Sequence, residues 1–234
     1  MNIPIVHGLI DPRILINFTA SPEAVQTILP AGFRPKLYNG HAIAGVCLIR
    51  LKHLRPKGVP AIFGLSSENG AHRIAVEWEE NGITREGVYM PRRDTSSKFN
   101  VLAGGRIFPG KHYAAKFNVR ESGDSYHVDY TSSDNTCISI TGRVSDRLND
   151  HSVFGNLERA SAFFEKGAVG YSPINGRKLQ GLELRTFTWK MQPLSVQDVY
   201  TSFFDTHNIP VRFDNALLMT GIAHEWRSTG EKRC

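Results

Sequence analysis

The stretch GGRIFPGKHYAAKFNVR, residues 104–120, decides between two folds. Gly105, Gly110 and Lys111 have the spacing of a phosphate-binding loop, which needs a hydroxyl residue after the lysine and a helix beyond it. His112 stands where that hydroxyl should be. The residues after it alternate between apolar and polar side chains, which is typical of a β-strand. The stretch therefore predicts a strand and argues against a nucleotide-binding loop.

Further strands are predicted along the first two thirds of the chain, where short apolar or alternating segments follow one another. These segments are residues 42–51, 72–78, 85–91, 125–132 and 135–144. Turn residues at 80–82 and 122–124 separate neighbouring segments and predict hairpins. Strands at such short spacing indicate an antiparallel barrel or sandwich.

About three helices are predicted between and after these strands. Ser21 as N-cap and Pro22 as the first helical residue predict a short helix. Apolar residues at helical spacing predict a second helix that ends near Gly167. Ser195 and Asp198 resemble a capping box and predict a third. Two more strands are expected at residues 182–191 and 216–226. The predicted fold is mainly β (α+β), in a single domain over residues 1–234.

Composition limits where the protein acts. A chain of 234 residues can bury a sizeable core, and its 41% hydrophobic and 21% charged residues are ordinary for a soluble globular protein. No apolar run approaches the roughly 18–20 residues that span a bilayer, and the N-terminal residues lack the pattern of a signal peptide. The sequence therefore predicts a cytoplasmic protein with no membrane partner.

Charge and cysteine content narrow the choice of partner. The net charge is +6, but the lysines and arginines are scattered and match no nucleic-acid-binding motif, so a small anionic ligand is predicted and nucleic acid is not. Cys47, Cys137 and Cys234 lie far apart without a C-x-x-C pair, and the nine histidines have no ligand spacing. The sequence predicts no disulfide framework, no metal and no cofactor.

The candidate site residues are charges in apolar or glycine-rich surroundings. Glu68 precedes an apolar strand, and Arg106 follows two glycines, where the backbone can approach a ligand closely. Arg93, next to Arg92 at the end of a strand, can bind a carboxylate through two parallel hydrogen bonds. Lys111 would have a lowered pKa if burial desolvated it. Structural roles remain open for each: a turn cap for Glu68, ion pairs for the arginines and solvent exposure for the lysine.

The order of these segments resembles the YqjF-like uncharacterised family, a branch of the acetoacetate decarboxylase-like superfamily. The resemblance covers nearly the whole chain and runs through AGFRP (31–35), NGHAIAGVCLIRL (39–51), GVYMPRRD (87–94), GGRIFPGKHYAAKF (104–117) and LLMTGIAHEW (217–226). It implies a closed, antiparallel-dominated, cone-shaped β-barrel with helices packed outside and a pocket at its centre.

The resemblance also bears on the lysine of the opening stretch. In decarboxylases of that superfamily, one of two adjacent lysines forms a Schiff base and the other lowers its pKa. Counted from Gly105 and Arg106, the two positions fall on Tyr113 and Ala114, so the lysine pair is absent from its place. Lys111 comes two residues early and by strand alternation faces the same side as Tyr113.

The sequence thus predicts a barrel protein that binds a small oxo-acid or related metabolite and, as an enzyme, uses acid–base chemistry such as enolisation without a Schiff base. The predicted catalytic residues are Glu68, Tyr113 and Lys111, and the predicted substrate-binding residues are Arg13, Arg93 and Arg106. By the resemblance, Glu68 matches the acidic residue before the pocket strand and Arg13 matches an N-terminal pocket arginine. His112 is expected to point away from the pocket. A non-catalytic ligand-binding protein of the same fold is the alternative, and the sequence leaves open whether the chain forms a homo-oligomer.

Overall fold

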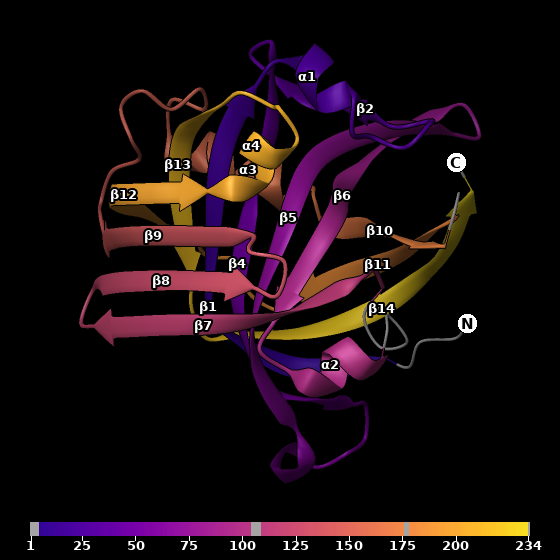
Figure 1. The fold of residues 1–234 in the computed structure, drawn as a ribbon, viewed down its shortest axis with the longest axis vertical. Coiled ribbons are helices and arrows are strands. Elements are labelled where there is room, and N and C mark those ends of the chain that lie inside the picture. The colour runs from indigo at the N-terminus through magenta and orange to yellow at the C-terminus, as the bar shows by residue number, and fades with distance from the viewer. Residues whose placement is uncertain (1–4, 104–108, 176–177, 234) are drawn as a thin grey trace.

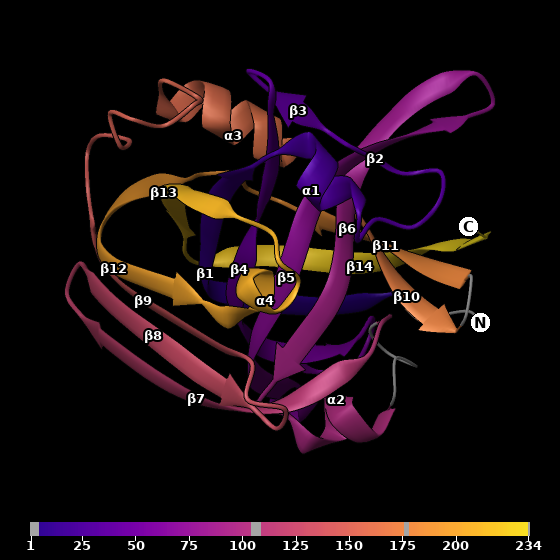
Figure 2. The same ribbon diagram turned by 45° about the horizontal axis from the view of Figure 1, so that its top comes forward.

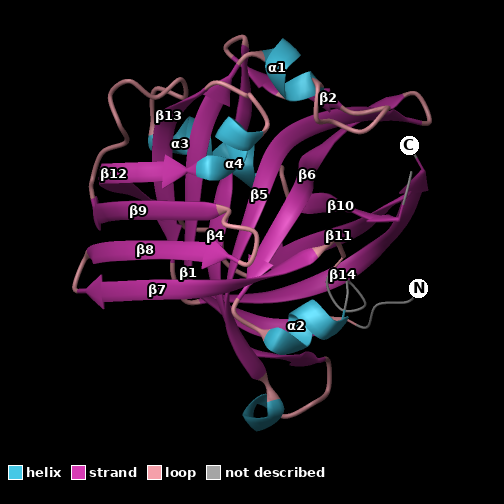
Figure 3. Cartoon of the chain, in the orientation of Figure 1, coloured by secondary structure: helices cyan, strands magenta, loops and turns pink. Residues whose placement is uncertain are grey.

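The computed structural model describes residues 5–103, 109–175 and 178–233, and most of them lie in strands (Figures 1 and 3). The strands are β1 (Val6–Ala20), β2 (Arg34–Pro35), β3 (Leu37–Tyr38), β4 (His41–Pro56), β5 (Leu65–Glu80), β6 (Ile83–Thr95), β7 (His112–Ser122), β8 (Ser125–Ser132), β9 (Cys137–Val144), β10 (Val169–Asn175), β11 (Lys178–Thr186), β12 (Gln192–Thr201), β13 (Val211–Met219) and β14 (Ile222–Arg233). The helices are α1 (Pro22–Gln26), α2 (Lys98–Ala103), α3 (Leu157–Glu165), α4 (Ser202–Thr206) and the 3-10 turn η1 (Ala61–Phe63). None of the helices in the described ranges is long and apolar enough to cross a membrane.

Four strands, β1, β4, β5 and β6, form the central part of the sheet. One edge of β1 pairs with β4, and the other pairs with β14 through residues 6–10 and with β13 through residues 13–20. At the far side, β6 pairs in parallel with both β10 and β7. Two groups of strands, β14–β11–β10 and β13–β12–β9–β8–β7, therefore run from β1 to β6 (Figure 1). Each of these two groups connects β1 with β6, so the sheet returns to its central strands along two paths.

Two hydrophobic cores lie on opposite faces of the central strands, because successive side chains of a strand point to opposite faces. On β4, Val46 and Leu48 belong to the core shared with β8, β9 and α4. Cys47 and Leu51 belong to the other core, which α3 covers with its aromatic side chains. Figure 2 shows α3 and α2 outside the strands, at opposite ends of the molecule. The face that carries Cys47 is the one that builds the candidate site.

Several local predictions are confirmed. The Ser21 hydroxyl accepts a hydrogen bond from the Ala24 amide, and α1 begins at Pro22. Asn81 and Gly82 adopt positive φ in the turn between β5 and β6, as a tight hairpin requires. The segment after Lys111 is strand β7 and not the helix of a phosphate-binding loop. The glycine-rich residues 104–108 lie outside the described residues.

The strand expected at residues 182–191 is displaced, because β11 ends at Thr186 and residues 187–191 form no strand. Two other predictions of secondary structure are wrong. Ser195 begins no helix: it lies in β12, which pairs antiparallel with β9, and the helix starts only at Ser202 with Thr201 as its N-cap. The ladder hydrogen bonds to β9 satisfy the backbone here, and this tertiary pairing overrides the local capping pattern. The single strand predicted over 216–226 is two strands, β13 and β14, because Gly221 turns the chain with a φ of 64°.

The fold class is confirmed at the level of mainly β structure with antiparallel pairing. In the described ranges the sheet has two parallel pairings, both on β6, and four α-helices accompany it where about three were expected. The pairings β10–β6 and β1–β4 lead the ladder back to its own strands. A closed, cone-shaped barrel stays a prediction of the resemblance.

Candidate functional site

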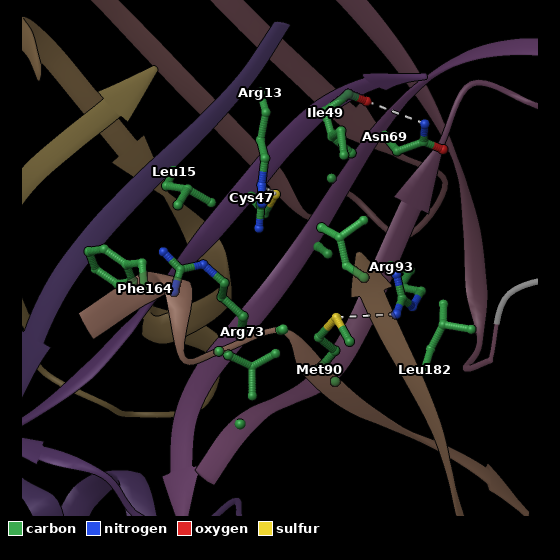
Figure 4. A pocket seen from close by; sticks show the side chains of 18 of the residues that line it. Arg13, Leu15, Cys47, Ile49, Asn69, Arg73, Met90, Arg93, Phe164 and Leu182 are labelled. Carbon is green, nitrogen blue, oxygen red and sulfur yellow. Dashed lines mark hydrogen bonds between the residues drawn. The ribbon is translucent and has the colours of Figure 1, made fainter. Parts of the chain in front are cut away.

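A cavity of about 110 Å³ lies between the central strands and α3 (Figure 4). The central strands β1, β4, β5 and β6 supply one wall, and α3, β11 and β14 supply the other. A single buried water needs roughly 10–15 Å³ by a comparable measure, so the cavity has room for a molecule of several non-hydrogen atoms. Its size suits a small metabolite rather than a nucleotide or a peptide.

The strand register aligns four cavity residues in one row. Cys47 is the partner of Ala71, Ala71 is the partner of Arg93, and Arg93 is the partner of His112. Residues directly opposite one another on neighbouring strands point to the same face, and the strands are about 4.8 Å apart. All four line the cavity. In this row the small side chain of Ala71 lies between Cys47 and Arg93.

Arg73, on β5, is the most deeply buried cation of the cavity. Its residue is 4% exposed, and its guanidinium lies 4.9 Å from the centre of the Phe164 ring. One terminal nitrogen donates to Asn17 Oδ1, whereas Nε has no hydrogen-bond partner. Burial lowers the pKa of Arg73 to about 10. A buried donor without a partner is costly, so Nε needs an acceptor that a ligand can supply.

Arg93 and Arg13 complete a set of three cavity arginines. Arg93 Nε lies 3.4 Å from Ser172 Oγ and its terminal nitrogen 3.2 Å from Met90 Sδ, both weak contacts for a guanidinium. Burial lowers the pKa of Arg93 to about 10. Arg13 Nε donates to Cys47 Sγ over 3.3 Å. Within the part of the chain that the structure describes, none of the three cavity arginines forms an ion pair with a carboxylate.

The neighbouring Arg92, unlike the cavity arginines, has carboxylate partners. It points to the opposite face of β6 and binds two carboxylates, Asp94 through Nε and Nη2 at 2.8–3.0 Å and Asp134 through Nη1 and Nη2 at 2.6–2.8 Å. Burial opposes its charge, but the hydrogen bonds to Asp134 and Asp94 outweigh burial and raise the pKa of Arg92. Asp94 also accepts hydrogen bonds from Tyr130 and Ser132. Although Asp94 touches the cavity wall, its oxygens are already occupied.

His112 is the cavity residue best placed for proton transfer. Its Nδ1 lies 3.1 Å from the carbonyl oxygen of Gly110, so Nδ1 carries the proton and donates, which leaves Nε2 with a lone pair. Burial lowers the pKa of His112 to about 4, and the charge of Arg93 acts in the same direction. The imidazole is therefore neutral at pH 7 and able to accept a proton.

The cavity offers a Schiff base no suitable amine among the described residues. Lys36 is the lysine of its lining; its Nζ lies 2.5 Å from a Glu86 carboxylate oxygen and 4.2 Å from the centre of the Phe163 ring. A nucleophilic amine must be neutral, whereas this ammonium is held by a carboxylate and an aromatic face. Over the described ranges, no group of three histidine, cysteine or acidic residues gathers as a metal site requires.

The structure separates the residues that the sequence grouped as catalytic. Glu68 pairs with Arg50 on the face opposite Asn69 and does not line the cavity. Tyr113 and Lys111 do lie on one side, with Lys111 Nζ 4.7 Å from the tyrosine ring, but that side is not the cavity side. The expected positions of these three residues in the pocket are therefore corrected.

The correction has one physical cause, the alternation of side chains along a strand. Choosing Glu68 instead of Asn69, and Tyr113 instead of His112, selects the faces of β5 and β7 that point away from the cavity. Arg13 and Arg93 line the cavity, and their role in substrate binding stays a prediction. Arg106 lies outside the described residues.

Sequence reasoning missed Arg73. Its signal is a charged side chain in the middle of the apolar run AHRIAVEW, residues 71–78, where arginine is expensive to bury without a partner. Histidine and arginine at successive positions, His72 and Arg73, necessarily face opposite sides of the strand. Only the arrangement of α3 and β11 shows which side encloses a cavity.

Known structures share this fold. The chain superposes on an acetoacetate decarboxylase-like enzyme from Sphingomonas wittichii RW1 with a TM-score of 0.61 and 11% identity, over 100% of this chain and 94% of that one. For acetoacetate decarboxylase from Legionella pneumophila the TM-score is 0.60 with 11% identity, over 98% and 88%. For the enduracididine biosynthesis enzyme MppR complexed with pyruvate it is 0.62 with 11% identity, over 100% and 91%. At this identity the likeness shows the fold alone.

Sequence comparison gives the family. No curated protein matches the chain in sequence. The family model DUF2071, described as an uncharacterized conserved protein (COG2071), matches residues 11–222. That range includes every described residue of the cavity lining except Trp226. The chain therefore belongs to the DUF2071 family and has an acetoacetate decarboxylase-like fold.

Proposed function

We propose that the protein binds a small oxo-acid or a related carboxylate in this cavity. The observation that carries the proposal is the gathering of Arg13, Arg73 and Arg93 on one cavity without a carboxylate partner among the described residues. Three cations in a poorly solvated space repel one another, and an anionic ligand removes that cost. Guanidinium groups bind carboxylates through paired, charge-assisted hydrogen bonds. The complex of MppR with pyruvate supports an oxo-acid as the class of ligand.

Enolisation is the chemistry that the cavity supports best. Neutral His112 would take a proton from the carbon next to the oxo group, and the cavity arginines would stabilise the negative charge that develops on the oxo oxygen. Lys36 takes no covalent part, because Glu86 holds its ammonium. The role given to Glu68 and Tyr113 from the sequence thus passes to His112.

One observation favours simple binding as the second candidate. Asp94 accepts hydrogen bonds from Arg92, Tyr130 and Ser132, so it has no free oxygen with which to take a proton. A base such as His112, with a pKa of about 4, works far from its best at neutral pH. A protein that binds an oxo-acid without converting it would have the same three arginines and would need no proton transfer by Asp94 or His112.

Binding is tested by thermal unfolding in the presence of pyruvate or of methyl pyruvate, its uncharged ester. Pyruvate should raise the melting temperature in a saturable way, and methyl pyruvate should not, because only pyruvate carries the carboxylate. Arg73→Met should abolish the response. Arg50→Met, which removes an arginine outside the cavity, is the matched control and should keep it. Equal responses to both compounds would contradict the proposal.

Turnover is tested by nuclear magnetic resonance of pyruvate in deuterium oxide. An enolising enzyme exchanges the methyl protons for deuterium, and His112→Gln should remove that exchange while pyruvate still binds. His127→Gln changes a half-exposed histidine that contacts Asp129 outside the cavity, so it should leave the exchange unchanged. Binding without exchange in the unmodified protein would establish the second candidate.

A further inference from the structure

Cys47 is the one group of the cavity row with nucleophilic chemistry that the proposed function does not use. It lies in the middle of β4, is 8% exposed and lines the cavity. Its Sγ accepts a hydrogen bond from Arg13 Nε at 3.3 Å (Figure 4). The nucleophilic form of cysteine is the thiolate, and neighbouring cations stabilise it. The sulfur therefore sits beside a cation at the wall of a space that can admit a ligand.

The other two cavity arginines are close enough to act on the same sulfur. Arg73 and Arg93 line the same cavity as Cys47, and Arg93 lies two strands from Cys47 in the cavity row, with Ala71 between them. Arg73 Nε is buried and without a hydrogen-bond partner. This unpartnered donor points independently to a ligand at the same place. A carboxylate bound there would hold the rest of its molecule next to the thiol.

We propose that Cys47 is a covalent nucleophile toward small 2-oxo acids in this cavity. The proposal rests on the proposed function, because the arginines must first hold the carboxylate. Sγ would form a bond to the carbonyl carbon of the oxo-acid, the π bond of the carbonyl would break, and its oxygen would receive the proton that sulfur loses. The product is a hemithioacetal or hemithioketal, and the addition needs no oxidant or second reactant. The thiol thus takes the covalent role for which the chain offers no lysine pair.

The first test compares two alkylating reagents that differ in charge. Iodoacetate carries a carboxylate and iodoacetamide does not. Charge of one sign in a cleft raises the local concentration of an oppositely charged reagent by roughly 10- to 1000-fold. We expect iodoacetate to label Cys47 at least about tenfold faster relative to iodoacetamide than it labels Cys137, as measured by peptide mass spectrometry. Pyruvate should protect Cys47 and leave Cys137 unprotected.

Variants of Arg13 test whether this arginine causes the preference of Cys47 for iodoacetate over iodoacetamide. Arg13→Met should reduce the preference of Cys47 for iodoacetate, whereas Arg13→Lys keeps a cation beside the sulfur and should retain more of it. Both variants are checked for folding by circular dichroism. Equal labelling of Cys47 by the two reagents in the unmodified protein, or no labelling of Cys47 by either, would overturn the proposal.

The second test observes the adduct itself with glyoxylate labelled with ¹³C at its aldehyde carbon. We expect a protein-bound hemithioacetal resonance that disappears in Cys47→Ser and Cys47→Ala. If glyoxylate raises the melting temperature of the unmodified protein but gives no such resonance, the covalent step is wrong and the binding function stands. If glyoxylate neither binds nor forms an adduct, the binding function fails as well.

Discussion

Arg93→Met should stabilise the unliganded protein while it weakens ligand binding. Burial lowers the pKa of Arg93 to about 10, well below the ordinary value for arginine. Each pH unit by which the pKa falls corresponds to about 1.36 kcal/mol, so burial of the charge destabilises the fold by up to about 3 kcal/mol at neutral pH. Relaxation of the protein around the charge offsets part of this cost, so we expect a gain of about 1 kcal/mol. For a chain of this length, that corresponds to a rise of roughly 2–4 °C in the melting temperature.

Arg92→Met is the matched control, because it changes the adjacent arginine from the same strand. Arg92 is bound by Asp94 and Asp134, and its removal leaves the buried Asp94 carboxylate without its cation. Breaking a buried ion pair in this way costs about 3–5 kcal/mol. The two substitutions should therefore shift the melting temperature in opposite directions.

The assay is thermal unfolding followed by circular dichroism, with and without pyruvate. Loss of a charge-assisted hydrogen bond of about 1.5–3 kcal/mol should weaken pyruvate binding by Arg93→Met roughly 10- to 150-fold. The reasoning is refuted if Arg93→Met destabilises the protein as much as Arg92→Met does. It is equally refuted if Arg93→Met binds pyruvate as tightly as the unmodified protein.

Three further predictions concern acid sensitivity, covalent chemistry and close packing. Burial lowers the pKa of His72 to about 3 and those of His112 and His224 to about 4, so the stability that these neutral histidines contribute is complete above pH 6.5 and is lost as the pH falls toward 4. If unfolding takes up three protons, the free energy of unfolding changes by up to about 4 kcal/mol per pH unit. Urea titrations at several pH values measure this slope. A free energy of unfolding that stays constant from pH 6.5 to 4.5 would contradict the prediction. Borohydride reduction with pyruvate should leave the intact mass of the protein unchanged, because Glu86 holds the ammonium of Lys36, and an adduct on any lysine would disprove this. Gly45→Ala should lower the melting temperature markedly, because the added carbon would lie 2.0 Å from a backbone oxygen of β1; an unchanged melting temperature would count against the register of β1 and β4.

The strands and turns that depend on local chemistry could be predicted from the sequence. The cap at Ser21, the turn at Asn81 and Gly82 and the extent of β8 all follow from neighbouring residues. The errors arose where distant partners decide. Pairing with β9 makes a strand of the segment around Ser195, and no local pattern contains that information.

The candidate site was partly predictable for a related reason. Arg93 was named because an arginine at the end of a strand can bind a carboxylate, and Arg13 was named from the family resemblance; both line the cavity. On β5 both faces pack against a core, so alternation alone does not show which face lines the cavity. On β7 the apolar residues Ala115 and Phe117 pack against the core opposite the cavity, so the alternation favoured the face of Tyr113. For this reason Tyr113 was predicted from the sequence instead of His112, and Arg73 was not predicted.

A crystal structure of the protein soaked with pyruvate tests the central claim most directly. The account predicts one pyruvate in the cavity between the central strands and α3. Its carboxylate oxygens should lie about 2.7–2.9 Å from nitrogens of at least two of Arg13, Arg73 and Arg93. Pyruvate bound only outside the cavity, or in the cavity with its carboxylate turned away from all three arginines, would contradict the account.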